Sequence, residues 1–511
     1  MKRLFGLIIL SFLLETVWSQ EADKFVVSEF RYEVSDSIMI GIAIDGYTGT
    51  YPHDQFIIPE KIDGKVVLHI TKSAFYGCKE VQGSLVLPPS LFSIGESSFY
   101  ECVGLTGDLV LSSSLRSLGA FAFTRCSFNG VLNLPDSLES IGQSAFMQCQ
   151  YFRGDLFLPS SIKEIGDGAF YECGFDGKLT LSSSLTSIQK NTFAECTFLA
   201  GNLTIPPAVT SIKARAFYSC RGFNGHLTLP SSLDSIGYAA FKDCSSFTGK
   251  LLLPVNLNSI EACSFYGCSG FDDGITLPTS IKTIGHETFS GCSGLNGSLV
   301  LPSQLETIGW SAFEDCSSLK GTLFLPNSVT IIGDAAFRDC HGFTGMLSLP
   351  FTLNRVGKHA FQNCRGFRGS LIMPSTIERI DDAAFSGCSG FDGILDLPST
   401  LKWLGESSFR DCHGFIGSLM LPSSLTTIGE AAFKDCRGFD GTLTIPSSMQ
   451  KIDRFAFKGC VNFAEVVCSN EVPPKLGEEV FSLSDMMLSC PTPEIYKQAD
   501  GWLEFEMIAP L

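Results

Sequence analysis

The chain has 511 residues, with 53 acidic residues against 36 basic ones, and a formal net charge of −17. A balance this acidic lacks the basic surface that nucleic acid or an anionic lipid headgroup requires, so we expect no nucleic-acid partner. The length would suffice for several ordinary domains, but internal repeats override that expectation and are sought first.

The first segment has the pattern of a secretory signal. Lys2 and Arg3 precede an apolar run, and small residues stand at two positions of VWS at 17–19 that a signal peptidase reads. The alternative is an uncleaved anchor, but Glu15 interrupts a run already too short to cross about 30 Å of hydrocarbon. We therefore predict a cleaved signal peptide at 1–19, no transmembrane segment, and a protein that is secreted or held at the cell surface.

A repeat of 23–24 residues follows. Seventeen cysteines recur every 24 residues, except after Cys126 and Cys173, where one residue is missing before the following Phe. A Phe stands three residues before each of these cysteines, and Ala, Ser or Thr precedes that Phe. A fixed ring beside a small residue suits a core in which each Phe packs on the Phe of the next coil. The structural Phe ladder includes Phe75, Phe99, Phe241, Phe313, Phe385, Phe433 and Phe457, and the structural Cys ladder includes Cys78, Cys102, Cys244, Cys340, Cys388, Cys436 and Cys460.

The other apolar positions repeat in the order G-x-L-x-L-P-x-x-L-x-x-I-G. The L-x-L alternation predicts a short strand that Pro ends, and L-x-x-I-G predicts a second extended piece. Repeats of 20 to 29 residues with this Leu/Ile spacing are typical of leucine-rich repeats. We predict a β-rich, α-poor leucine-rich-repeat solenoid of about 17 stacked coils, whose parallel strands lie about 4.8 Å apart.

The form I-P-x-x-L-x-x-I-G-x-x-A-F-x-x-C resembles the BspA-type leucine-rich repeats, which are found in secreted and surface proteins of mucosal bacteria and protist parasites. The segment Gly46–Cys78 resembles the first coil of that family, and Cys468–Ile508 resembles its closing coil, with Tyr496, Trp502 and Phe505 in the expected places. The resemblance implies adhesion.

The ends of a solenoid must be covered to keep the chain soluble. With the resemblance, this predicts an N-terminal β cap at 20–53, repeats at 54–477 and a C-terminal capping repeat at 478–511.

The 20 cysteines of an exported chain raise the question of disulfides. The ladder cysteines are odd in number and apolar in context, and in this repeat class the Cys is normally a buried turn residue, so buried thiols are favoured over bridges between rungs. A disulfide between Cys468 and Cys490, which lie off the ladder, stays open. No CxxC or HxxxH occurs, so we expect no metal and no cofactor.

Catalytic motifs are missing from the sequence: there is no GxSxG, no P-loop and no dinucleotide fingerprint. We predict that the protein is not an enzyme, although residues from several coils could still meet in a catalytic site. Asn202 and Asn296 begin sequons and would be N-glycosylation sites in a eukaryotic source.

One variable position stands out, nine residues before each ladder Cys, and we call it the outer column. It holds Ser at each coil from Ser93 to Ser259, apart from Glu164. It then continues as Thr283, Thr307, Ile331, Arg355, Arg379, Trp403, Thr427 and Lys451. Because this residue alternates with an inward Ile on a strand, we expect its side chain to face outward.

Trp and Arg are enriched where partners dock, so the candidate binding patch is Ile331, Arg355, Arg379, Trp403 and Lys451. The alternative is that these residues reflect neutral sequence change on a face that tolerates any residue. Trp310 is a second exposed aromatic candidate.

These observations favour a secreted or cell-surface binding protein that acts in adhesion or protein–protein interaction, with a protein or glycan on a host or neighbouring cell surface as partner. The alternative is a structural scaffold without a dedicated ligand. If the outer column is exposed, removing Arg379 and Trp403 should barely change stability, because exposed substitutions cost within about 0.5 kcal/mol.

Overall fold

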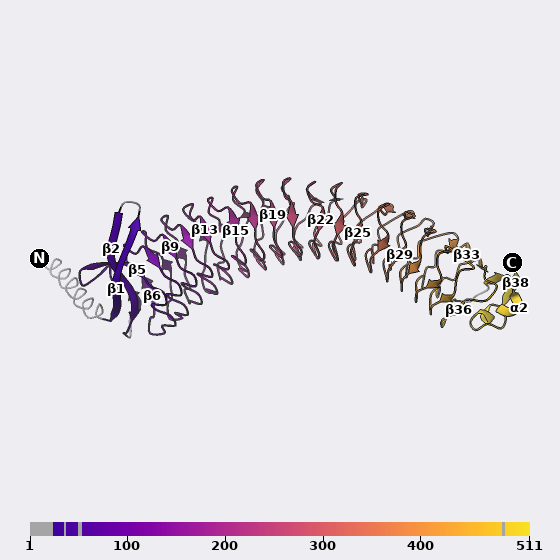
Figure 1. Cartoon of the computed structure of the whole chain (residues 1–511), viewed down its shortest axis with the longest axis horizontal. Coiled ribbons are helices and arrows are strands. Elements are labelled where there is room, and N and C mark those ends of the chain that lie inside the picture. The colour runs from indigo at the N-terminus through magenta and orange to yellow at the C-terminus, as the bar shows by residue number, and fades with distance from the viewer. Residues whose placement is uncertain (1–23, 35–36, 50–53, 483–485) are drawn as a thin grey trace. The chain divides into compact units, whose positions relative to one another are not determined.

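The computed structural model describes residues 24–34, 37–49, 54–482 and 486–511, so the predicted signal peptide lies outside the described residues. The chain divides into two compact units, Met1–Phe247 and Thr248–Leu511. Each unit is a solenoid of stacked coils with parallel strands and almost no helix (Figure 1), which confirms the predicted fold class. No helix of the described residues is both long and apolar enough to cross a membrane.

Most coils contribute two very short strands. The first comes from L-x-L and forms the Leu row, and the second comes from the end of L-x-x-I and forms the Ile row. In the Leu row the Leu is buried and the next residue is exposed, as in Leu109–Val110; in the Ile row the order is reversed, as in Arg355–Val356. This alternation follows from the two-residue period of a strand, and it leaves one outward position per row and coil.

In the first unit, the strands of both rows pair in parallel with those of neighbouring coils. The Leu row contains β3 (Gln55–Ile57), β6 (Ser84–Val86), β8 (Leu109–Val110), β10 (Leu132–Asn133), β12 (Leu156–Phe157), β14 (Leu179–Thr180), β16 (Leu203–Thr204) and β18 (Leu227–Thr228). The Ile row contains β5 (Lys65–Ile70), β7 (Ser93–Ile94), β9 (Ser117–Leu118), β11 (Ser140–Ile141), β13 (Glu164–Ile165), β15 (Ser187–Ile188), β17 (Ser211–Ile212) and β19 (Ser235–Ile236).

The second unit repeats the pattern. Its Leu row contains β21 (Ile275–Thr276), β23 (Leu299–Val300), β26 (Leu347–Ser348), β28 (Leu371–Ile372), β31 (Leu419–Met420), β33 (Thr442–Ile445), β35 (Glu465–Cys468), β37 (Met487–Cys490) and β38 (Met507–Pro510). Its Ile row contains β20 (Ser259–Ile260), β22 (Thr283–Ile284), β24 (Thr307–Ile308), β25 (Ile331–Ile332), β27 (Arg355–Val356), β29 (Arg379–Ile380), β30 (Trp403–Leu404), β32 (Thr427–Ile428), β34 (Lys451–Ile452) and β36 (Lys475–Leu476).

Different elements stand at the two ends of the chain. Strands β1 (Phe25–Val34) and β2 (Ser37–Tyr47) form an antiparallel hairpin, β2 pairs with β5, and the short β4 (Lys61–Ile62) also pairs with β5. At the other end lie α2 (Pro493–Tyr496) and the 3₁₀ turn η1 (Trp502–Glu504). The indole N–H of Trp502 donates to the Pro474 carbonyl at 2.9 Å, so its buried polar group is satisfied. The residue limits of the two caps remain a prediction.

The ladder phenylalanines stack face to face along each unit. From Phe75 to Phe241 successive ring centroids are 4.8–5.7 Å apart with interplanar angles of 2–11°. From Phe265 to Phe481 the values are 5.3–5.7 Å and 2–13°. Stacked aromatic rings that are fully buried contribute both area and geometry, so each ring fixes the position of the next coil.

The ladder cysteines bind one coil to the previous one. Cys102 Sγ donates to the Phe75 carbonyl at 3.0 Å, and the same bond recurs from coil to coil, for example from Cys388 to Phe361 at 2.9 Å. Burial of the thiol raises the pKa of Cys102 to about 12. Cys468 and Cys490, for which a disulfide was left open, are both free thiols, and Cys468 accepts a hydrogen bond from the Tyr496 hydroxyl at 3.1 Å.

We predict that Phe385→Ala loosens the second unit. The ring is fully buried between Phe361 and Phe409, and removing a buried Phe costs about 3–5 kcal/mol. Limited proteolysis should cut this variant near the altered coil. The matched control is Phe324→Ala, because Phe324 is 74% exposed and its variant should resist protease like the unaltered chain. Equal resistance of both variants would contradict the assignment of the Phe ladder to the core.

We also predict the thiol count. All 20 cysteines are free, and Cys78 is the one that is partly exposed. Because buried neutral thiols are poor nucleophiles, a thiol reagent should titrate about one group in the native chain and all 20 after denaturation without reductant. Eighteen in the denatured chain would indicate one disulfide, and a full count in the native chain would contradict the buried ladder.

Candidate functional site

The candidate patch centres on three consecutive strands of the second unit. Strands β27, β29 and β30 form a parallel ladder in which Arg355 lies beside Arg379 and Arg379 beside Trp403. The side chains of Arg355 and Arg379 are about half exposed, and Trp403 is 43% exposed, whereas the next residue of each strand is buried. The three side chains therefore project from the same face, one per coil.

A buried carboxylate holds the two arginines. Asp381 has a fully buried side chain, and its two oxygens accept hydrogen bonds from Nε of Arg355 and Nε of Arg379. A second acid, Asp334, lies 3.5 Å from the Arg355 guanidinium. Charge-assisted bonds to a group that is out of contact with water are stronger than surface ion pairs, so Asp381 restricts both guanidinium groups.

Asp381 stands where most coils have the Gly of I-G. The backbone of the previous coil is close at this position: a Cβ added to Gly405 would lie 2.6 Å from the backbone nitrogen of Asp382. Two other coils that depart from Gly also direct the side chain to the outer column. Gln189 Nε2 donates to Ser187 Oγ at 2.7 Å, and Lys451 Nζ lies 2.6 Å from an Asp453 oxygen.

Trp403 receives the second guanidinium contact. The Arg379 Cζ lies 4.9 Å from the centre of the indole ring, which is the range of a cation–π interaction. Arg379 thus donates to Asp381 through its Nε and places its guanidinium over the Trp403 ring. The arrangement presents a positioned indole with one Arg against it and a second Arg one coil further, which suits contact with a planar or apolar group flanked by negative charge.

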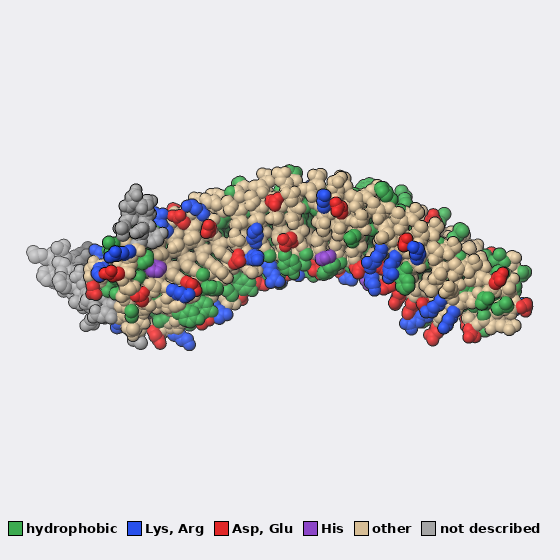
Figure 2. All heavy atoms as spheres, in the orientation of Figure 1, with side chains coloured by type: hydrophobic (Ala, Val, Ile, Leu, Met, Phe, Trp, Pro, Cys, Tyr) green, Lys and Arg blue, Asp and Glu red, His purple; other side chains and the backbone are tan. Residues whose placement is uncertain are grey.

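The other two predicted residues extend the patch unequally. Ile331 is 54% exposed on β25, which packs beside β27. Lys451 on β34 is separated from Trp403 by Thr427 of β32 and pairs with its own Asp453. Figure 2 shows Lys and Arg side chains gathered at the surface where Figure 1 labels β29. The structure therefore brings together Ile331, Arg355, Arg379 and Trp403, and leaves Lys451 apart.

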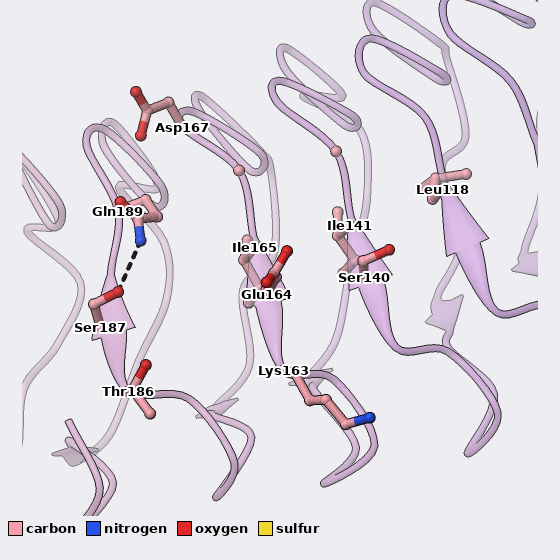
Figure 3. Close-up of a pocket in the computed structure, with 12 residues that line it drawn as sticks. Leu118, Ser140, Ile141, Lys163, Glu164, Ile165, Asp167, Thr186, Ser187 and Gln189 are labelled. Atoms are coloured by element: carbon pink, nitrogen blue, oxygen red, sulfur yellow. Dashed lines mark hydrogen bonds between the residues drawn. The ribbon is translucent and has the colours of Figure 1, made fainter.

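The outer column of the first unit is different in shape. The hydrogen-bonded sheet of the Ile row is interrupted between β13 and β15, and a hollow of about 540 Å³ opens there. Figure 3 shows Glu164 projecting from β13, with the small Ser140 and Ser187 on the strands to either side. Small serines thus make a shallow trough in this unit, whereas the large residues of the second unit build a raised surface.

The remaining predicted positions are also placed. Asn202 and Asn296 are exposed, and Asn202 Oδ1 accepts a hydrogen bond from the His226 backbone N–H at 2.8 Å. Trp310 is 43% exposed, and its ring stacks on His286 at 5.1 Å between centroids. Within the described ranges, no group of three or more His, Cys, Asp or Glu residues could hold a metal ion.

The family model described as BspA type Leucine rich repeat region (6 copies) matches residues 68–200, 130–248, 210–344, 258–392 and 354–488. No curated protein matches the chain.

Solved structures that are similar to the chain include a leucine-rich repeat protein from Bacteroides ovatus ATCC 8483, with 18% identity, coverage of 88% of this chain and 97% of the other, and a TM-score of 0.38. A leucine rich cell surface protein from Faecalibacterium prausnitzii A2-165 has 20% identity, coverage of 89% and 96%, and a TM-score of 0.29. The pneumococcal vaccine antigen PcpA has 18% identity, coverage of 60% and 92%, and a TM-score of 0.34.

Arg355 and Arg379 together neutralise the buried Asp381 carboxylate, an arrangement that we call the clamp. Loss of these arginines should therefore cost more stability than loss of an ordinary exposed residue. We predict that Arg355→Ala/Arg379→Ala lowers the free energy of unfolding by about 3 kcal/mol, because it leaves the buried Asp381 carboxylate without a positive partner. Adding Asp381→Gly, the residue of most coils, should restore most of this loss. Denaturant unfolding of both variants measures the difference. A triple variant no more stable than the double variant would show that Asp381 does not depend on the arginines.

Proposed function

The chain belongs to the BspA-type leucine-rich repeat family, and on this premise we propose that it is a secreted or cell-surface binding protein whose ligand, a protein or glycan of a host or neighbouring cell surface, docks on the outer column of the second unit. The observation that carries the proposal is the clamp at Asp381, which positions Arg379 against Trp403. We name Ile331, Arg355, Arg379 and Trp403 the clamped face.

The preorganisation of the two arginines supports a binding role over neutral sequence change. A long Arg side chain normally loses about 2 kcal/mol of rotamer entropy when a partner immobilises it. On the clamped face, the buried carboxylate has already restricted both arginines, so less freedom remains to be lost on binding. Arginines that arose by neutral sequence change on a tolerant surface would need no buried acid beneath them. Asp381, however, replaces the Gly that suits this crowded position in most coils.

A scaffold without a dedicated ligand is the second candidate. The feature in its favour is the uniformity of the outer column of the first unit, where Ser recurs from Ser93 to Ser235 with Glu164 as the exception. A face of small hydroxyl side chains offers few of the aromatic or Arg anchors that dominate binding energies. A binding protein needs the clamped face to hold its ligand, whereas a scaffold does not. A binding assay therefore distinguishes the two candidates.

The test measures binding of the chain from residue 20 onward to epithelial cells and to arrays of matrix proteins and glycans. We expect saturable binding that Trp403→Ala weakens at least tenfold, because hot-spot aromatics contribute 2 kcal/mol or more. The variant Arg379→Ala/Asp381→Gly/Trp403→Ala should abolish binding, and it leaves no unpaired carboxylate buried at position 381.

The matched control is Arg365→Ala/Phe324→Ala. Both residues are exposed in the same unit, at positions outside the outer column, so this variant loses one Arg and one aromatic ring away from the clamped face. It should bind like the unaltered chain. Binding that survives in the triple variant would contradict the role of the clamped face, and absence of saturable binding by the unaltered chain would favour the scaffold.

A further inference from the structure

A second hollow, on a different side of the first unit, is built around the shortened coil that contains Cys173. It has a volume of about 530 Å³, and its lining includes the rings of Tyr151, Tyr171 and Phe198, the carboxylates of Glu172 and Glu195, and one cationic side chain, Arg153. We name it the aromatic slot. It shares no residue with the trough around Glu164 or with the clamped face.

The missing residue explains why aromatic side chains stand here. In most coils the second residue after the ladder Cys is Gly, because a side chain would meet the previous coil: a Cβ on Gly222 would lie 2.6 Å from the Leu199 carbonyl oxygen. Tyr151 and Phe198 occupy this same position in the two coils that follow shortened coils. Deletion of one residue relieves the crowding and makes room for a large side chain on the next coil.

Packing does not account for the two rings. Tyr151 is 53% exposed and Phe198 is 64% exposed, so neither is buried in the space that the deletion leaves. The backbone and the Arg153 guanidinium fill that space, because a Cβ on Gly174 would lie 2.0 Å from the Gln150 carbonyl oxygen and 2.9 Å from Nη1 of Arg153. The two rings belong to coils two steps apart, on the order of 10 Å, with Gly174 on the coil between them.

The floor of the slot is acidic. Glu172 and Glu195 stand one residue before a ladder Cys, where the backbone is left-handed, with φ of 56° and 61°. Some coils have Gly at this position, as at Gly267, and others have a polar residue, as at Asp243. A carboxylate is therefore held in a conformation that L-residues adopt at some cost. Burial, together with the charges of Glu172 and Glu195, raises the pKa of the Tyr171 hydroxyl, which is consistent with a negative potential in the slot.

Nearby arginines are engaged with other groups. Arg125 pairs with Glu101 at 2.8 Å, and Arg153 Nη1 donates to the carbonyl oxygens of Phe152 at 2.8 Å and Gly174 at 3.3 Å. The oxygens of Glu172 accept hydrogen bonds from the neutral amides of Gln148 at 2.9 Å and Gln150 at 2.6 Å, which orient the carboxylate and leave its charge in place.

We infer that the aromatic slot binds a cationic side chain, the guanidinium of Arg or the ammonium of Lys, presented by a protein partner. The faces of the aromatic rings attract cations, and the attraction grows when carboxylates share the site. An anionic group would meet Glu172 and Glu195, and a neutral group would gain nothing from their charge. The slot thus gives the first unit a charge preference opposite to that of the arginines on the clamped face.

The test uses the chain from residue 20 onward and the peptide Ac-Gly-Arg-Gly-Arg-Gly-NH₂, with binding measured by calorimetry. The comparison peptide carries citrulline for Arg, which keeps the shape and removes the charge. We expect the Arg peptide to bind and the citrulline peptide to bind at least tenfold more weakly. Tyr151→Ala/Phe198→Ala and Glu172→Gln/Glu195→Gln should each weaken binding of the Arg peptide about fivefold or more.

The matched control is Phe157→Ala/Glu164→Gln, which removes one exposed aromatic ring and one exposed carboxylate from other faces of the same unit. This variant should bind the Arg peptide like the unaltered chain, so a general attraction of a basic peptide to an acidic protein is separated from the slot. Equal binding of both peptides, or an equal loss in the control and the slot variants, would overturn the inference. Circular dichroism of every variant checks that the fold is kept.

Discussion

The structure depends on one repeated contact, the stacking of a ladder Phe on the Phe of the next coil at 4.8–5.7 Å. This distance is close to the spacing of hydrogen-bonded strands, so ring stacking and strand pairing are satisfied by the same step. The ladder thiol, which donates to the Phe carbonyl of the coil before, adds a third bond with the same period. Within each unit every residue therefore lies beside its counterpart one coil away, and side-chain columns become the units of surface and core.

The same step explains the recurrent glycines, since it leaves no room for a Cβ at certain turn positions. A Cβ on Gly405 would lie 2.6 Å from the backbone nitrogen of Asp382, and one on Gly222 would lie 2.6 Å from the Leu199 carbonyl oxygen. Departures from Gly at such positions are informative because they need a local reason. At Asp381 the reason is the pair of guanidinium groups above it, and at Tyr151 and Phe198 it is the shortened coil before each of them.

Much of the fold could be predicted from the sequence, because the core residues recur in the sequence about every 24 residues, which is the length of one coil. The outward direction expected for Arg355, Arg379 and Trp403 also agrees with their exposure, since strand alternation decides it. Asp381 was missed, although its replacement of a repeat Gly was a readable signal. The contact of both arginines with one carboxylate depends on side-chain packing across coils, which spacing alone does not determine. For the same reason the Cys468 and Cys490 thiols could not be assigned as paired or free.

Both surfaces proposed here arise where the repeat is broken, and this is a consequence of how a solenoid is stabilised. Residues that recur in every coil are committed to the core and cannot vary without loss of several coil contacts. A ligand, in contrast, must be recognised at one place along a periodic surface, and identical coils would offer many equivalent registers. Asp381 beneath Arg355 and Arg379, and the pair of Tyr151 and Phe198 on either side of the shortened coil after Cys173, are combinations that differ from those of neighbouring coils and so reduce that degeneracy. Local exceptions to the repeat are thus the positions at which a periodic fold can form a unique binding site for a partner.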